Sequence, residues 1–174
     1  MAEYYNTGKI VATYGLHGEM ILWHKTGKAD AFKEVPAIFI EDKKDSFIPY
    51  FIESTRIRNE EEVYLKLEGI MTKEKAAKLL QKQVYLDEDH FRKIVSPGSA
   101  LFYLGFKVQD KTAGTLGLVA EVVELPAQLL LKIYQNNKEL LIPLNPNTLH
   151  RIDKINKVIH VILPDGLLDI YKVQ

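Results

Sequence analysis

The sequence predicts a mostly β protein made of two tandem small antiparallel β-barrels, joined by a short linker, with one short helix in the N-terminal domain. Three observations point to this fold class. Short runs of alternating apolar and polar residues recur in both halves of the chain and are separated by polar turns, which is typical of closed antiparallel sheets. This periodicity is lost over residues 87–99. The length of 174 residues fits two small domains.

The first half is predicted to form six strands and one helix. Val63–Leu67 alternates cleanly between apolar and polar positions. A helix is predicted to begin after Thr72, a plausible N-cap, because Glu74 lies in the first turn and Ala76 is followed by leucines at helical spacing. The predicted strands are Lys9–Tyr14, Glu19–His24, Ala37–Glu41, Phe47–Arg58, Val63–Leu67 and Gln83–Leu86.

A glycine-containing turn joins the first two of these strands. Two glycines lie three residues apart there, and glycine is the default residue where the backbone needs a positive φ or a close approach. The spacing matches neither a phosphate-binding loop nor a dinucleotide-binding loop, so it predicts a tight β-hairpin corner. We call this turn, together with the glycine that precedes the first strand, the N-terminal signature. Its residues are Gly8, Gly15, Leu16, His17, Gly18 and Glu19.

The second half is also predicted to be nearly all strand. We place the N-terminal domain at residues 4–88, the linker at 89–99 and the C-terminal domain at 100–174. The segment Gln135–Lys138 predicts a hairpin turn because asparagine tolerates a positive φ, and Leu167–Tyr171 predicts one helical turn. The predicted strands are Gly105–Gln109, Leu116–Glu124, Leu129–Tyr134, Leu140–Leu144 and Val158–Leu163.

The run Leu101–Phe106 is apolar at nearly every position. As a strand, it would place Phe102, Leu104 and Phe106 on one face and Tyr103 on the other. Two alternatives remain open: a strand covered on both faces at the domain junction, or a strand with one face exposed as a docking surface.

Composition and charge narrow the function. The chain has no cysteine and a formal net charge of zero, so it lacks the basic excess typical of proteins that bind nucleic acid through counterion release. No histidine pair has the spacing of metal ligands, and we expect no metal, no cofactor and no membrane segment. The expected location is the cytoplasm.

Two other functional classes compete with protein docking. An enzyme would have to use His17 with Glu19 as an acid/base pair, without a recognisable nucleophile. An RNA-binding barrel could stack bases on exposed aromatic side chains; the candidates are Tyr14, Trp23, Tyr64 and Tyr103.

Several motifs, in order along the chain, resemble those of the RimM family of ribosome maturation factors. The first is Gly8 followed by Gly15-Leu16-His17-Gly18-Glu19, and the second is the helix start Gly69–Leu79. The C-terminal motifs are Leu104–Val108, Gly117–Val122, Leu125–Ala127, Leu141–Pro143 and Leu163–Leu168. The resemblance implies an N-terminal six-stranded barrel of the translation-factor type, followed by a PRC barrel.

The resemblance also implies a role. It implies a non-catalytic assembly factor that binds the immature 30S subunit through small-subunit ribosomal protein nineteen of the head and promotes head maturation and 16S rRNA processing. A monomer is expected, and direct contact with rRNA is the alternative. Family members often carry paired tyrosines before the PRC-barrel glycine, but this chain has Gly98-Ser99 there. The expected partner-binding residues are Ser99, Phe102, Tyr103, Leu125, Pro126 and Ala127.

Overall fold

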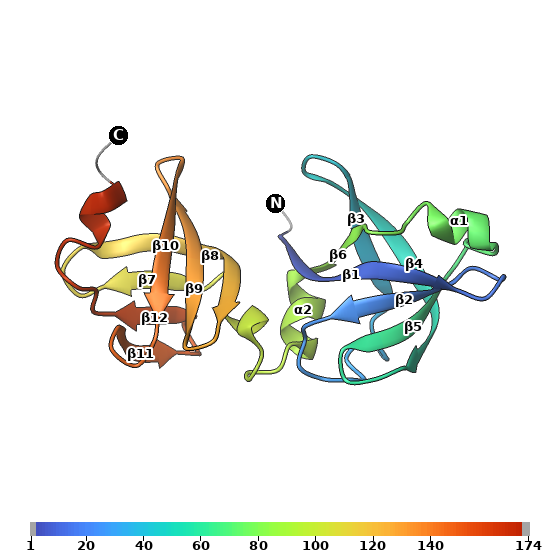
Figure 1. Cartoon of the computed structure of the whole chain (residues 1–174), viewed down its shortest axis with the longest axis horizontal. Helices are drawn as coiled ribbons and strands as arrows, with labels where there is room; N and C mark the ends of the chain where they lie inside the picture. Colours follow the sequence, from blue (N-terminus) through green and yellow to red (C-terminus); the bar gives the residue numbers. More distant parts are fainter. Residues whose placement is uncertain (1–2, 172–174) are drawn as a thin grey trace. The chain divides into compact units, whose positions relative to one another are not determined.

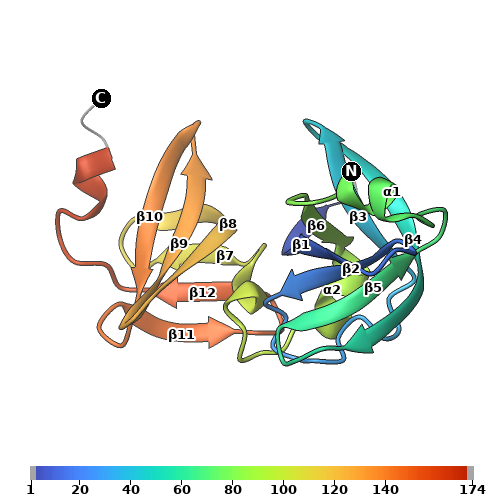
Figure 2. The same ribbon diagram turned by 45° about the vertical axis from the view of Figure 1, so that its right-hand side comes forward.

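The computed structural model describes residues 3–171 and divides the chain into two compact units. Unit 1 ends at Phe102, and unit 2 begins at Tyr103. Both units consist mainly of β-strands, as the sequence predicts (Figures 1 and 2). No helix within residues 3–171 has the length and apolar character needed to cross a lipid bilayer.

Unit 1 is a closed six-stranded barrel with the strand order β1-β2-β5-β4-β3-β6. All its strand pairs are antiparallel. Its strands are β1 (Tyr4–Tyr14), β2 (Glu19–His24), β3 (Ala37–Lys43), β4 (Ser46–Ile57), β5 (Glu62–Leu67) and β6 (Gln83–Asp87). The short helix α1 (Lys73–Ala77) begins at the predicted N-cap, since the Thr72 side chain accepts a hydrogen bond from the Lys75 N–H.

The core of unit 1 follows the two-residue alternation of its strands. In β5, for example, Val63, Leu65 and Leu67 are all buried, whereas Tyr64 and Lys66 lie on the outer face. Gly8 lets β1 approach β2 closely, because a Cβ atom at this position would lie 2.0 Å from the Trp23 carbonyl oxygen. The other fully buried core side chains of the barrel include Ile10, Met20, Leu22, Ile38, Val84 and Leu86.

The segment expected as a linker, residues 89–99, contains most of a second helix, α2 (Glu88–Ile94). Asp87 caps this helix by accepting a hydrogen bond from the His90 N–H at 3.0 Å. Phe91 is fully buried and its ring stacks on Tyr5, with the centroids 4.7 Å apart. The helix is only seven residues long and has one fully buried residue, which is too little for a helical period to show in the sequence.

Unit 2 is a six-stranded sheet with the order β10-β9-β8-β7-β12-β11. Its elements are the 3₁₀ helix η1 (Ala100–Tyr103), which spans the unit boundary, β7 (Lys107–Asp110), β8 (Gly114–Leu125), β9 (Gln128–Gln135), β10 (Lys138–Leu144), β11 (Leu149–Asp153), β12 (Val158–Val161) and the 3₁₀ helix η2 (Leu168–Tyr171). One pair departs from the expected antiparallel arrangement, because β12 returns from the β11 hairpin to pair with β7 in parallel. The sequence analysis also missed β11, whose first three residues are exposed.

The strand predicted for residues 101–106 is wrong. Residues 100–103 form η1, and Gly105 then turns the chain with a φ of 78°. The Ser99 hydroxyl accepts the Leu101 N–H at 3.2 Å and so starts the turn. Leu104 and Phe106 are both buried, whereas residues 101–103 are partly exposed, so this apolar run does not form a two-faced strand.

Two predicted turns of unit 2 are confirmed. Asn136 and Asn137 have φ values of 51° and 63° and join β9 to β10 as a two-residue hairpin turn. The predicted helical turn at the C-terminal end is η2, which contains Tyr171.

The free edge of β10 is occupied by side chains. The Tyr171 hydroxyl accepts the Leu141 N–H at 3.1 Å and donates to the Leu141 carbonyl at 3.0 Å. Two residues further along β10, Pro143 has no N–H, and its carbonyl accepts the Thr148 hydroxyl at 2.7 Å. These contacts satisfy backbone groups that an edge strand would otherwise present to another strand.

Candidate functional site

The N-terminal signature forms a clamped corner of the barrel. A Cβ atom on Gly18, whose φ is 88°, would lie 2.1 Å from the Ile70 carbonyl oxygen. The Lys66 ammonium donates to the carbonyl oxygens of His17 and Ile70. The signature glycines therefore hold the β1–β2 turn against the segment before α1, and Leu16 at the tip of the turn is 70% exposed.

The structure does not pair His17 with Glu19. Oε1 of Glu19 instead accepts a hydrogen bond from Nη2 of Arg56 at 2.7 Å. The carboxylate is thus engaged in an ion pair on the barrel surface. Within residues 3–171, no group of three or more histidine or carboxylate side chains is arranged to hold a metal ion.

Aromatic and arginine side chains gather on the outer face of unit 1. We call Tyr14, Trp23, Arg56, Arg58 and Tyr64 the arginine–aromatic face; they come from β1, β2, β4 and β5, except Arg58, which directly follows β4. The Arg56 guanidinium carbon lies 4.5 Å from the Tyr64 ring centroid, and the Tyr14 and Tyr64 centroids are 4.6 Å apart. Strand register brings them together, since Arg56 lies directly opposite Tyr64.

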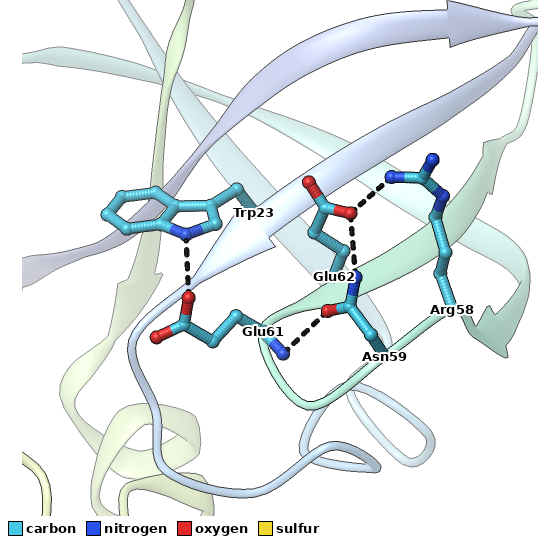
Figure 3. Close-up of polar contacts among 5 residues, drawn as sticks. All are labelled: Trp23, Arg58, Asn59, Glu61 and Glu62. Atoms are coloured by element: carbon cyan, nitrogen blue, oxygen red, sulfur yellow. Dashed lines mark hydrogen bonds and ion pairs between the residues drawn. The ribbon is translucent and has the colours of Figure 1, made fainter.

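Carboxylates lie beside the cations and the indole of this face. Figure 3 shows Glu62 bonded to Arg58 and to Asn59, with the Asn59 amide nitrogen 2.9 Å from the carboxylate. In the same view, the Trp23 indole N–H donates to Glu61 at 3.4 Å. The Lys25 ammonium lies 5.3 Å from the centre of the Trp23 ring.

These contacts limit what the arginine–aromatic face can do. The Tyr64 ring already contacts Arg56 and Tyr14, so a base could stack on it only by displacing one of them. The neighbouring carboxylates offset the arginine charges that would attract phosphates. Tyrosine, tryptophan and arginine are, however, the residue types that dominate binding energy at protein interfaces.

A second exposed surface lies on the sheet of unit 2. Val123, Leu130 and Pro143 lie opposite one another on β8, β9 and β10, and we call them the apolar row. Each is partly exposed, whereas the next residues, Leu131 and Ile142, are fully buried on the other face. The outer face of three adjacent strands therefore carries a continuous apolar strip.

The apolar row continues into three of the predicted partner-binding residues. Leu125 is 41% exposed and pairs with Gln128, so that Pro126 and Ala127 form the exposed β8–β9 turn. On the opposite side of the row, the Lys132 ammonium lies 2.8 Å from a Glu121 carboxylate oxygen. An apolar centre with charged side chains at its margin is typical of a protein interface.

The other predicted partner-binding residues have structural contacts. The Ser99 hydroxyl donates to the Lys25 carbonyl, and the Phe102 carbonyl accepts from Arg92 at 3.2 Å. The Tyr103 ring meets Phe106 edge-on, with the centroids 5.9 Å apart. Ser99 and Phe102 belong to unit 1 and Tyr103 to unit 2. Sequence analysis missed Val123, Leu130 and Pro143, for which only their position within apolar strands could have been a signal.

Family models match both units. The RimM N-terminal domain matches residues 5–91, and the RimM PRC barrel domain matches residues 101–167.

Named relatives match nearly the whole chain. The ribosome maturation factor RimM of Christiangramia forsetii is 30% identical over 172 residues, which covers 97% of each chain. That of Bacteroides thetaiotaomicron is 33% identical over 175 residues, which covers 99% of this chain and 96% of the relative. A crystal structure of a RimM protein from Pseudomonas aeruginosa aligns with a TM-score of 0.46 at 18% identity, covering 93% of this chain and 98% of the other. The chain belongs to the RimM family of ribosome maturation factors.

Proposed function

We propose that the protein is a non-catalytic ribosome assembly factor. It binds the immature 30S subunit as a monomer in the cytoplasm, through small-subunit ribosomal protein nineteen, and promotes maturation of the head and processing of 16S rRNA. The relatives that match the chain are named ribosome maturation factors. The partner and the step are inferred from the family resemblance.

The observation that carries this proposal is the apolar row of unit 2 and its continuation at Leu125. Three strands place Val123, Leu130 and Pro143 side by side on an outer sheet face. A rigid, partly exposed apolar strip gains free energy when a partner covers it. We therefore assign ribosomal protein nineteen to this strip, with Leu125, Pro126 and Ala127 at its margin.

Docking of this kind can promote assembly without covalent chemistry. A factor that binds one conformation of the immature head more tightly than the others raises the population of that conformation. The population shift is limited by the difference in affinity between the states, and about 1.4 kcal/mol of difference changes their ratio tenfold. A mature subunit that no longer offers the favoured conformation would release the factor.

Binding to rRNA through base stacking is the second candidate. Tyr14 and Tyr64 do lie together on unit 1, as this idea requires. Arg56, however, already lies over the Tyr64 ring on which a base would stack, and the chain has no excess of positive charge. Both observations favour a protein partner instead. Tight binding to naked rRNA with a steep dependence on salt would support the RNA-binding alternative.

Co-sedimentation with ribosomal particles tests the proposal. The wild-type chain should sediment with immature 30S subunits and not with mature ones. A Leu125→Asp/Leu130→Asp variant should lose this binding, whereas Ile155→Asp should keep it, because Ile155 is 92% exposed in the turn between β11 and β12. Equal binding to both kinds of particle, or full binding by the double variant, would sink the proposal.

A further inference from the structure

Unit 1 contains an open pocket of about 470 Å³ between the β2–β3 loop and α2. Three lysines line it: Lys28 and Lys33 from the loop and Lys93 from the helix. His90 lies on the same wall. The volume is within the range of about 300–1,000 Å³ that is usual for small-molecule sites.

The cations of this pocket outnumber its carboxylates. Asp30 and Glu34 also line it, yet within residues 3–171 neither carboxylate forms an ion pair with the three lysines. On the arginine–aromatic face, by contrast, the arginines are bonded to glutamates. The lysine charges of the pocket therefore stay available to an anion.

The loop that carries Lys28 is held rigidly against the chain that follows α2. The Ser96 N–H donates to the Thr26 carbonyl at 2.7 Å, and a Cβ atom on Gly27 would lie 2.8 Å from the Ser96 Cβ. Phe32, just before Lys33, is fully buried. Because both ends of this loop segment are anchored, a ligand would not have to order the loop, which lowers the cost of binding.

The helix side of the pocket is also fixed. Nδ1 of His90 lies 2.7 Å from a carboxylate oxygen of Asp87, the N-cap of α2, and donates its hydrogen to it. Partial burial acts to raise the pKa of Asp87, but the hydrogen bonds from His90 outweigh it and hold this pKa below its usual value. The carboxylate therefore stays ionised and keeps the His90 ring in place.

We propose that this pocket binds a phosphate group through Lys28, Lys33 and Lys93. Lysine ammonium groups bind phosphate as point charges, and three of them against two carboxylates give this concave site a net positive charge on a protein whose net charge is zero. The phosphate can be a phosphodiester of RNA or a free phosphate. This inference goes beyond the proposed function, because it concerns unit 1 and does not require the protein partner.

The test is a titration of the ¹⁵N-labelled full chain, followed by amide chemical shifts. One arm adds inorganic phosphate and the other adds a single-stranded RNA hexanucleotide. Shift changes confined to the amides of residues 28–34 and 90–94 support the pocket in either arm. Changes with RNA at concentrations where phosphate has no effect identify the phosphodiester, and changes with phosphate alone identify a small anion. No localised change in either arm overturns the proposal.

A triple variant, Lys28→Gln/Lys33→Gln/Lys93→Gln, should bind at least about tenfold more weakly, because it removes hydrogen bonds to a charged group. If RNA is the ligand, the slope of log K against log salt should also become shallower, by about 0.7 for each phosphate that the variant no longer neutralises.

The matched control removes the same charge elsewhere on unit 1, at the exposed lysines Lys43, Lys44 and Lys73. An equal reduction of affinity in this control would show that only the overall charge matters, and would overturn the proposal. Failure here leaves the sedimentation test of the proposed function unaffected, because that test depends on unit 2.

Discussion

Substituting Gly18 by alanine tests the clamped corner of the barrel, and Gly15→Ala is its internal control. Both glycines have a positive φ, 67° at Gly15 and 88° at Gly18. They differ in their surroundings: a Cβ on Gly15 would meet no atom within 4 Å, whereas a Cβ on Gly18 would lie 2.1 Å from the Ile70 carbonyl oxygen. The pair therefore separates backbone strain from the need for close approach.

The two effects can be estimated separately. A left-handed conformation costs an alanine about 1–2 kcal/mol, and the lower chain entropy of the unfolded state offsets about 0.4–1 kcal/mol of this. Gly15→Ala should therefore reduce the free energy of unfolding by about 1 kcal/mol. In Gly18→Ala the added Cβ also overlaps the Ile70 carbonyl, and overpacking of this kind costs about 1–3 kcal/mol. Moving Ile70 aside would also strain the hydrogen bond that its carbonyl accepts from Lys66. The expected total is about 3 kcal/mol.

The assay is urea unfolding followed by tryptophan fluorescence. Trp23 is the single tryptophan of the chain and lies in β2 of the same barrel, so the signal reports the unfolding of unit 1. The m-value should stay constant while the midpoint falls further for Gly18→Ala than for Gly15→Ala. Equal midpoints for the two variants would refute the close-approach reasoning.

Three further predictions concern stability. Tyr171→Phe leaves the Leu141 N–H and carbonyl without their partner and should lower the free energy of unfolding by about 1–3 kcal/mol, measured by calorimetry. Tyr134→Phe is the control and should have little effect, because Tyr134 is 56% exposed. Phe91→Ala removes a fully buried ring and should lower the urea midpoint of unit 1 by an amount equivalent to about 3–5 kcal/mol. Burial lowers the pKa of His24 below its ordinary 6.5, so the unfolded state binds a proton more readily than the folded state. Unit 1 should therefore lose stability as the pH falls below about 6.5, and the urea midpoint should fall between about pH 8 and pH 5.5. In the His24→Gln variant this fall should be absent.

Local sequence signals predicted the strands and turns well where each residue has one role. The alternation in Val63–Leu67 predicts both the strand and its buried face, and the paired asparagines at 136–137 predict the hairpin turn because few other residues accept a positive φ. The signal fails in Leu101–Phe106, where apolar residues at nearly every position are equally compatible with a strand and with the partly exposed 3₁₀ helix that forms there.

Other features depend on contacts between distant residues. The parallel pairing of β12 with β7 is set by where the β11–β12 hairpin docks, and no local pattern encodes it. The apolar row was missed for a related reason. Leu129, Leu130 and Leu131 are adjacent leucines, and only the register with β8 and β10 shows which of them faces outward. The lysine pocket likewise combines residues of a loop and a helix that lie far apart in the sequence.

The contacts along β10 bear on how a partner can bind unit 2. An added strand would need free N–H and carbonyl groups on this edge, but Tyr171 occupies those of Leu141 and Thr148 occupies the Pro143 carbonyl. Strand addition at these positions would have to break the contacts first. The outer face of the sheet carries no such cost, because Leu130 and Val123 are already partly exposed there. Binding through this face depends on side chains instead of backbone, and so a single charged substitution at Leu130 should affect partner binding more than the loss of the edge contacts in Tyr171→Phe.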